Sequence, residues 1–276
     1  MKFIKTVKFD FKYGILKRWY TYLIYAVLSV SACADFFFRL KSFDITAFSL
    51  GDCLFYFYSG INEYIPKPDE PIQIPYLFLL LNLLVCYFNV HYMSDDLSGL
   101  GQYVICRSGK RRSWWLSKCL WNFTSVLIYF SLSFFIVFLF SVFSHAELSL
   151  RISESMNLIC PVSDGQYPID QWGIGVLQLF LLPMLVCSAV SMLQMFISLF
   201  VRPLISYVFS VIIYFSSMYK LSALLLGNYA MILRSDKVTV NGVSSLFGIV
   251  FSVSLILLSV VCGAIYFKNY NILIRE

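Results

Sequence analysis

Long apolar stretches constrain the fold of this chain more than any other feature of its sequence. A helix needs about 20 consecutive apolar residues to cross the hydrocarbon core of a membrane. Stretches of roughly that length lie at about 15–34, 72–93, 119–143, 172–201, 203–219 and 245–267. Apart from Lys17 and Arg18, which can extend toward the membrane surface, none of the six contains a charged side chain. With 59% hydrophobic and 13% charged residues, the composition excludes a soluble globular domain. It predicts an all-α polytopic membrane protein with six transmembrane helices in one domain, 1–276.

Lysine and arginine are distributed unequally between the two sides of these spans. Loops on the cytoplasmic side of a membrane carry the excess of positive charge. Fourteen of the 21 basic residues fall in 1–18, in 94–118, at Arg202 and after 267, a count that includes Lys118 as a loop residue. The sequence therefore predicts that both chain termini are cytoplasmic, as an even number of spans requires.

Residues 1–18 form an amphipathic pattern at the helical period. The apolar face consists of Ile4, Val7, Phe11 and Ile15, and the neighbouring basic face of Lys5, Lys8 and Lys12. Such a helix is expected to lie in the membrane interface. Two roles remain open for it: a plain anchor attracted to anionic lipid, or a lever that links a cytoplasmic partner to the first span.

The segments assigned to the opposite side are too short to form domains. Segment 35–71 ends in the proline-rich run YIPKPDEP, and segment 144–171 is polar and contains several turn-forming residues. Within 220–244, the apolar run LSALLLGNYAMIL is too short to cross, so we expect a hairpin that is re-entrant or lies on the surface. Cys53 and Cys160 fall on this same side and could form a disulfide.

The sequence is poor in residues that carry out catalysis. Its two histidines, His91 and His145, are predicted near opposite faces of the membrane, and its cysteines form no CxxC pair. It contains no metalloprotease or serine-hydrolase motif, and Gly109–Lys110 lacks the other glycine of a phosphate-binding loop. We therefore expect no catalytic residue, metal site or cofactor on this chain, and no nucleic-acid partner.

Polar residues inside the predicted spans are few. The main ones are Asn82, Asn89, Gln178 and Gln194. Because such groups are costly in lipid, they tend to face other helices or an aqueous path. Interhelical hydrogen bonding and a substrate path are both compatible with the pattern. The spans carry no chain of carboxylates or lysines, which weighs against a proton-coupled transporter.

Segment 94–118 combines charge, glycine and tryptophan in a way that membrane anchoring explains only in part. Along the chain it contains Asp95, Asp96, Gly99, Gly101, Tyr103, Arg107, the cluster Lys110, Arg111 and Arg112, and the pair Trp114 and Trp115. Basic residues at the headgroups and tryptophans at the interface are typical of many membrane proteins. The paired aspartates and the glycine-bounded turn are not, and they favour a surface that contacts another protein.

The run DLSGLGQYVICRSGKRRSWWLSKCLWN resembles the corresponding loop of bacterial ABC-2 type permease subunits. Three further stretches share this resemblance: GINEYIPKPDEPIQIP before the second span, LLLGNYAMILRSD, and CGAIYFKNYNIL near the end. The similarity in layout covers nearly the whole chain, and its motifs are typical of the family without being diagnostic of function. The resemblance implies a type V exporter-like fold with six helices and an N-terminal helix in the membrane interface.

The resemblance also implies partners and a mechanism. Two permeases, identical or paralogous, would pair around a path in the plasma membrane of a bacterium. Each would dock a separate ABC ATPase that holds ATP and Mg. The ATPase-coupling loop would contain Asp95, Asp96, Gly99, Gly101, Tyr103, Arg107, Arg111 and Arg112, and the interface helix would carry Lys5, Lys8 and Lys12. The substrate path would be lined by Asn82, Asn89, Gln178 and Gln194.

Relatives with this loop pattern often export peptides such as bacteriocins and lantibiotics, or confer resistance to them. The expected substrate is therefore a peptide or another amphipathic molecule. A second interpretation remains open from a different class, a membrane-embedded immunity or scaffold protein without transport activity. Such a protein would need the same spans but no coupling loop.

Overall fold

The computed structural model describes residues 2–64, 73–99, 101–103, 105, 111–161, 175, 177–239 and 241–268. Within these residues the chain is helical and forms no β-strand. The α-helices are α1 (Lys2–Asp10), α2 (Trp19–Ser42), α3 (Leu50–Tyr58), α4 (Tyr76–Ser98), α6 (Arg111–Phe143), α7 (Met156–Ile159), α8 (Leu182–Ile197), α9 (Pro203–Tyr219) and α10 (Ser245–Lys268). Shorter elements are the π-helical η1 (Phe11–Ile15) and η3 (Leu177–Leu181), and the 3-10 turns η2 (Leu16–Arg18), η4 (Leu226–Ala230) and η5 (Ile232–Arg234).

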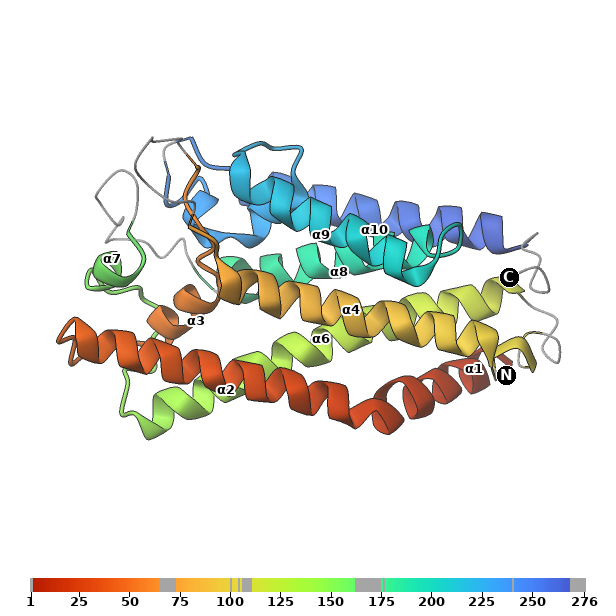
Figure 1. Cartoon of the computed structure of the whole chain (residues 1–276), viewed down its shortest axis with the longest axis horizontal. Helices are drawn as coiled ribbons and strands as arrows, with labels where there is room; N and C mark the ends of the chain where they lie inside the picture. The colour runs from red at the N-terminus through yellow and green to blue at the C-terminus, as the bar shows by residue number, and fades with distance from the viewer. Residues whose placement is uncertain are drawn as a thin grey trace.

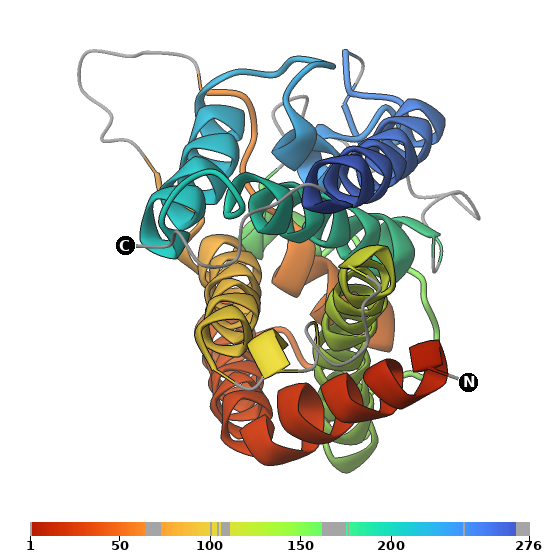
Figure 2. The same cartoon turned by 90° about the vertical axis from the view of Figure 1, so that its right-hand side faces the viewer.

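The longer helices run lengthwise through an elongated bundle, as Figure 1 shows. In contrast, α1 lies across one end of the bundle, at a steep angle to the helices that Figure 2 shows end-on. We call this the α1 end; it also holds the last turns of α4 and α10 and the first turn of α6. The opposite end, which we call the α3 end, holds α3, α7 and the turns η4 and η5.

Five helical segments are long and apolar enough to cross a membrane. They are Phe3–Ser42, Tyr76–Leu97, Arg111–Phe143, Gln178–Ile197 and Ser245–Lys268. Together they support a multi-pass membrane protein of the helical type, as the sequence predicts. The predicted fifth span, 203–219, forms α9, whose 17 residues extend only about 25 Å.

Several helices extend beyond the spans predicted from the sequence. The first helix reaches Ser42 instead of residue 34, and the second includes Asp95 and Asp96 instead of ending before them. The third begins at Arg111 instead of 119, which brings Lys118 inside α6. Some of the charged residues in these added turns have partners in the protein: Asp35 pairs with Arg39, Asp95 with Arg18, and Asp96 with Lys118.

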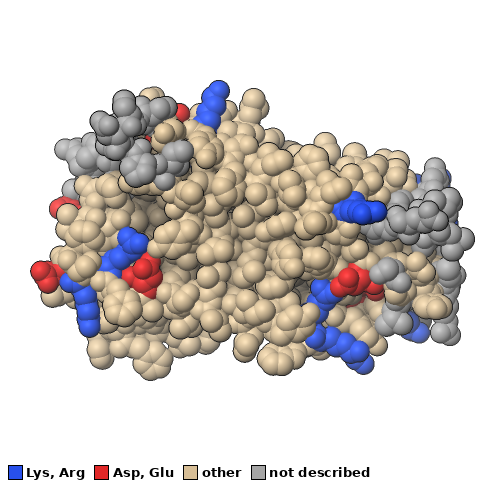
Figure 3. Space-filling model, in the orientation of Figure 1, with Lys and Arg blue, Asp and Glu red and all other residues tan. Residues whose placement is uncertain are grey.

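Helix α10 turns small and polar residues toward the protein and large apolar residues away from it. Ser252 and Gly263 are buried, whereas Leu246, Val250 and Ile265 are more than half exposed. In a membrane, lipid covers the large apolar side chains and small residues let helices approach closely. The surface agrees with this environment, because charged side chains gather at the two ends of the face in Figure 3 and its middle carries none.

Helix α3 is a buried element that the sequence analysis did not predict. All nine of its residues are buried, and it contacts α2, α6 and η3. A capping box begins the helix: the Asp52 backbone N–H donates to the Ser49 hydroxyl at 3.1 Å, and the Ser49 N–H donates to the Asp52 carboxylate at 2.8 Å. Ser153 donates to the same carboxylate through its backbone N–H (2.7 Å) and its hydroxyl (2.9 Å). Asp52 therefore ties α3 to the segment before α7.

Replacing Asp52 with alanine is expected to destabilise the α3 end. Loss of the cap costs about 1 kcal/mol, and the donors of Ser49 and Ser153 left without an acceptor add about 1–3 kcal/mol. Burial raises the pKa of Asp52, and the hydrogen bonds from Ser153 and Ser49 oppose that rise. A titration with sodium dodecyl sulfate (SDS) in mixed micelles measures the change in unfolding free energy. The exposed Glu154→Ala variant is the control, and equal stability of the two variants would contradict the prediction.

A buried arginine closes the α3 end. Arg234, the last residue of η5, is 1% exposed, and all the hydrogen bonds that it donates end on neutral oxygens. The acceptors are the carbonyl oxygens of Ile61, Asn62, Ser217, Met218 and Lys220 and the side-chain oxygen of Asn228. Burial lowers the pKa of Arg234 to about 10, so the side chain stays charged at neutral pH. Segment 220–244 thus contains two 3-10 turns that Arg234 attaches to the end of α9.

Cys53 and Cys160 form no disulfide in the structure, although both lie at the α3 end. Cys53 is in the first half of α3 and Cys160 directly follows α7. Both side chains are buried, and burial raises the pKa of the Cys160 thiol to about 11. The pairing considered from the sequence is therefore absent, and the Cys160 thiol is protonated at neutral pH.

Candidate functional site

Lys118 is a fully buried lysine near the α1 end of the bundle. Because α6 begins at Arg111, Lys118 lies about two turns inside the helix, and its side chain is 0% exposed. The sequence analysis counted it as a loop residue, which was wrong, since the helix starts before the apolar run that predicts it. A lysine is almost never fully buried unless it is paired with an opposite charge.

Two carboxylates from two other helices meet this lysine. The Lys118 ammonium pairs with Asp10 of α1 and lies 2.7 Å from Oδ2 of Asp96 in α4. Both aspartates are buried as well. The ion pairs therefore join α1, α4 and α6 at one point inside the protein, where solvent screens them little.

Neighbouring polar groups complete what we call the Lys118 cluster: Asp10, Tyr92, Asp96, Trp114, Ser117 and Lys118. The hydroxyls of Ser117 and Tyr92 donate to Asp10, the latter at 3.0 Å. The Trp114 indole N–H donates to Asp96 at 3.2 Å. The rings of Tyr92 and Trp114 also lie within cation–π distance of the ammonium, at 4.4 and 5.1 Å. Each buried charge thus has several partners, as burial of an ion requires.

Helix α1 presents Asp10 on a face of small and polar residues. Thr6, Asp10 and Gly14 recur every four residues and are buried. Gly14 lies so close to α4 that a Cβ atom there would come within 2.8 Å of the Tyr92 ring. The residues of the predicted apolar face lie beside this stripe: Ile4 is 60% exposed, and Val7, Phe11 and Ile15 are partly buried. The N-terminal segment therefore directs its polar stripe into the protein and leaves Lys5, Lys8 and Lys12 exposed, as suits a helix in the membrane interface.

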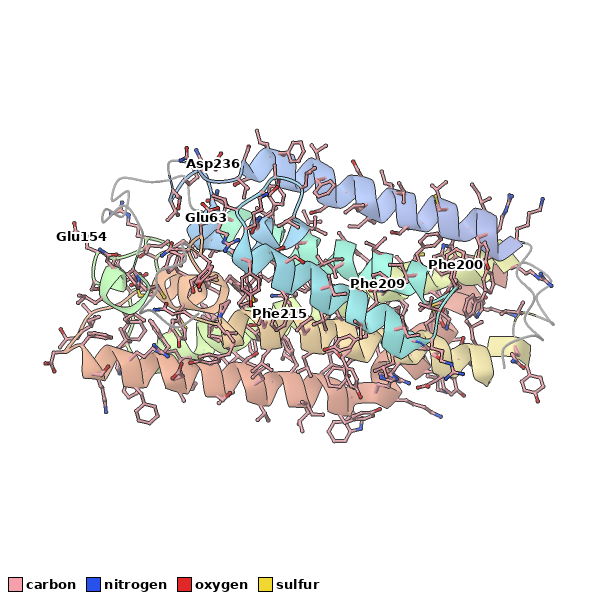
Figure 4. The ribbon with its side chains drawn as sticks, turned by 45° about the horizontal axis from the view of Figure 1, so that its top comes forward. Glu63, Glu154, Phe200, Phe209, Phe215 and Asp236 are labelled. Carbon is pink, nitrogen blue, oxygen red and sulfur yellow. The ribbon has the colours of Figure 1, made fainter. Side chains whose placement is uncertain are left out.

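The other aspartate of the adjacent pair holds the end of this segment. Asp95 forms an ion pair with Arg18, the last residue of η2. Among the described acidic residues, those at the α1 end are Asp10, Asp95 and Asp96, and all three are ion-paired. Of the pair that membrane anchoring did not explain, Asp95 thus fixes the N-terminal segment to the last turns of α4, and Asp96 fixes α4 to α6. The acidic residues labelled at the opposite end are Glu63, Glu154 and Asp236 (Figure 4).

The glycine-bounded turn follows directly after the Lys118 cluster. Gly99 ends α4, and residues 101–103 are again helical. Gly101 lies against Asp96, and a Cβ there would collide with the Asp96 carboxylate. Tyr103 projects from this turn and is 76% exposed. The predicted coupling residue Arg107 lies outside the described residues.

The remaining coupling and interface-helix residues lie on the surface of the α1 end. Arg111 and Arg112 form the first turn of α6, where Arg112 is exposed and Arg111 is partly buried. Lys5, Lys8 and Lys12 are exposed along α1 and η1. These five cations surround the cluster without entering it.

The intramembrane polar residues form hydrogen bonds between helices. Asn89 of α4 donates to Asn122 of α6 and to Ser191 of α8, both at 3.2 Å. It also accepts from Ser125 at 2.9 Å, and Ser191 donates to Asn122 at 2.8 Å. This buried network links α4, α6 and α8.

The other three predicted path residues lie apart from that network. Asn82 accepts a hydrogen bond from Tyr214 at 3.3 Å, and Gln194 accepts one from Ser210 at 2.9 Å. Gln178 donates to Ser235 at 2.9 Å and to Ser245 at 2.6 Å. All four predicted path residues are at most 4% exposed. Within the described chain they stabilise contacts between helices, and Gln194 also donates to the Cys86 carbonyl of α4 at 3.3 Å.

Sequence reasoning missed Asp10 and Lys118, although a signal exists for each. Asp10 is the only acidic residue before Asp35, and it stands four residues from both Thr6 and Gly14. Lys118 stands four residues from Trp114, so an α6 that begins before 119 places both on one face. What no spacing shows is that Asp10 and Lys118, 108 residues apart, meet.

Comparison with known proteins gives a family for the chain. No curated protein and no solved structure matches it. A family model described as "Protein of unknown function (DUF2705)" matches residues 23–273. The matched part contains Asp96 and Lys118 and begins after Asp10. Since the match covers most of the sequence, the chain belongs to the DUF2705 family.

Proposed function

We propose that this chain is the permease subunit of an ATP-driven exporter of the ABC-2 type. It would work with a second permease and a separate ATPase that holds ATP and Mg, in the plasma membrane of a bacterium. The inferred cargo is a peptide or another amphipathic molecule. The observation that carries the proposal is the Lys118 cluster, because it joins α1 to the helix from which the exposed turn at Tyr103 emerges.

The cluster gives a partner protein a mechanical connection to the membrane helices. A force on the turn reaches Asp96 through Gly101, which lies against it. From Asp96 the ion pairs to Lys118 and on to Asp10 carry the displacement into α6 and α1. Packed elements that move together in this way can switch a transporter between two states when ATP binds a partner.

The charges of the α1 end support a cytoplasmic orientation. The described acidic residues at this end are ion-paired in or beside the Lys118 cluster. The other exposed charges described there are basic: Lys5, Lys8, Lys12, Lys17, Arg112, Arg202 and Lys268. Because loops on the cytoplasmic side carry the excess of lysine and arginine, we place both chain ends in the compartment that contains ATP.

The buried polar residues have a structural role in this proposal. Asn89 and Gln194 are hydrogen-bonded to neighbouring helices within one chain, which favours interhelical bonding over a path through this subunit alone. We infer that the substrate passes along the surface between two permeases. Exposed faces such as that of α9 supply the area for this; Figure 4 labels Phe209 and Phe215 along that helix.

Replacing Tyr103 with alanine is expected to reduce co-purification of the ATPase about tenfold or more. The reason is that an aromatic side chain that anchors an interface commonly contributes about 2 kcal/mol or more to binding. The measurement is the ratio of ATPase to permease after affinity purification of tagged permease. The matched control is Tyr20→Ala, which removes a 48% exposed tyrosine from α2. If Tyr103→Ala and Arg107→Ala both bind and stimulate the ATPase normally, the assignment of the coupling turn is wrong.

The alternative of a non-transporting immunity or scaffold protein is separated by a transport assay. Sealed vesicles that contain the chain, its ATPase and a labelled peptide are compared with and without ATP. An exporter accumulates peptide only with ATP, whereas a scaffold binds the same amount in both conditions. ATP-independent binding alone would overturn the exporter proposal.

A further inference from the structure

An apolar groove lies between α2 and α6 toward the α3 end. Its volume is about 490 Å³, and its lining residues are Val30, Cys33, Ala34, Phe37, Ile136, Leu139, Phe140 and Ser144. All of these side chains except that of Ser144 are apolar. The rings of Phe37 and Phe140, 6.4 Å apart, connect the two walls. A space of this size is therefore bounded almost entirely by hydrocarbon.

In a membrane, this groove faces lipid. Both of its walls belong to segments that can cross a membrane, Phe3–Ser42 and Arg111–Phe143. Val30 and Leu139 are 55% and 37% exposed on its rim. Water needs two or more polar partners to occupy such a space, and these walls offer the hydroxyl of Ser144. The occupant must therefore be apolar where it contacts α2 and α6.

The positively charged side chain of Lys41 lies at the end of the groove nearest the membrane surface. Lys41 follows Phe37 by one helical turn, and its ammonium lies 4.6 Å from the centre of the Phe37 ring. The side chain is exposed in the last turn of α2. Ser144, just after α6, lies at the same end of the groove. The exposed carboxylate nearest along the chain is Asp44, in the turn after α2. An apolar groove with a lysine at its mouth matches a hydrocarbon chain that ends in an anionic group.

We propose that this groove holds one acyl chain of an anionic phospholipid, from the leaflet at the α3 end, with the lipid phosphate beside Lys41. Van der Waals contacts with the concave apolar walls would hold the acyl chain, and the lysine adds the attraction to a negative headgroup. Concave walls and a positioned charge distinguish this site from general lipid contact. The proposal depends on the membrane location of the chain and is independent of transport.

Native mass spectrometry of the purified full chain tests the proposal. The chain in detergent micelles is titrated with dioleoyl phosphatidylglycerol or dioleoyl phosphatidylcholine, and the adducts that survive collisional activation are counted. We expect one tightly retained phosphatidylglycerol. Ala34→Trp, which fills the groove from α2, is expected to weaken its binding about tenfold or more. Lys41→Gln is expected to reduce the preference for phosphatidylglycerol over phosphatidylcholine about fivefold.

Matched variants exclude general effects. Val261→Trp places the same side chain at an exposed position of α10, and Lys237→Gln removes an exposed lysine elsewhere at the α3 end. Ser144→Trp fills the groove from the α6 side if Ala34→Trp does not fold. Equal lipid retention in the groove and control variants would show annular lipid only and overturn the proposal. A dimer in place of a lipid adduct would also overturn it, because the groove would then hold a second copy.

Discussion

Replacing Lys118 with methionine is expected to lower the free energy of unfolding by about 3–5 kcal/mol, because Asp10 and Asp96 lose their shared cation while staying buried. Methionine keeps most of the length of the lysine side chain, so little of the loss comes from a cavity. An SDS titration in mixed micelles measures the change.

A variant that removes all three charges separates electrostatics from packing. Breaking a buried ion pair is strongly destabilising, whereas replacing every member with neutral groups is often close to neutral. The triple variant Lys118→Met, Asp10→Asn and Asp96→Asn is therefore expected to recover at least half of the lost stability. Arg112→Met, which removes an exposed cation from the same helix, is the control. A triple variant as unstable as Lys118→Met would show that the cluster acts through packing alone.

The same substitution is expected to loosen α1 before the bundle unfolds. Asp10 is the buried charged residue that holds α1 to α6. Loss of its partner lets α1 unfold locally, so that trypsin can cleave the backbone after the exposed side chains of Lys5, Lys8 and Lys12. We expect cleavage at these lysines to become about tenfold faster, the factor that corresponds to a local change of about 1.4 kcal/mol. N-terminal sequencing of the fragments identifies the sites. Unchanged cleavage in a destabilised protein would mean that Lys118 does not hold α1.

The membrane character and most helices were predictable because they depend on local composition. The runs at 72–93 and 245–267 correspond closely to α4 and α10, which begin at Tyr76 and Ser245. Likewise, the break near Gly99 and a helical turn at Tyr103 follow from glycine placement. Each of these features is decided by neighbours within a few turns of chain.

The Lys118 cluster and α3 were not predictable in the same way. Lys118 meets Asp10 across 108 residues, and no local pattern says that a lysine beside an apolar run will be buried. The short α3 has an apolar run of the right length for several structures, and its burial depends on the space between α2, α6 and η3. Periodicity shows which residues of a segment share a face but not what that face will contact.

The N-terminal segment shows this ambiguity most clearly. In water, the face with Ile4 would point into the protein, yet Thr6, Asp10 and Gly14 do so here. Lipid is as good a neighbour for isoleucine as a protein core is, so in a membrane the polar residues determine the inner face. The polar stripe itself therefore indicates that Asp10 is buried and needs a cation as its partner.

Replacing Arg234 with methionine is expected to cost about 3–5 kcal/mol as well, by a different mechanism. Arg234 forms no ion pair with the residues that the structure describes; instead, carbonyls of the end of α9 and of residues 61 and 62 lose their donor. Each buried acceptor left without a partner costs about 1–3 kcal/mol, and relaxation recovers part of the sum. The end of α9 also loses a cation at the negative end of its helix dipole.

Lysine at the same position distinguishes charge from geometry. Arg234→Lys keeps the positive charge but offers three donors on a single nitrogen, and it cannot reach acceptors on both sides as the guanidinium does. We therefore expect it to lose about half as much stability as Arg234→Met in the same SDS titration. Lys237→Met, an exposed change three residues away, should have little effect. If Arg234→Lys matches the unmodified chain, charge at the end of α9 is sufficient and the forked hydrogen bonding does not hold the α3 end together.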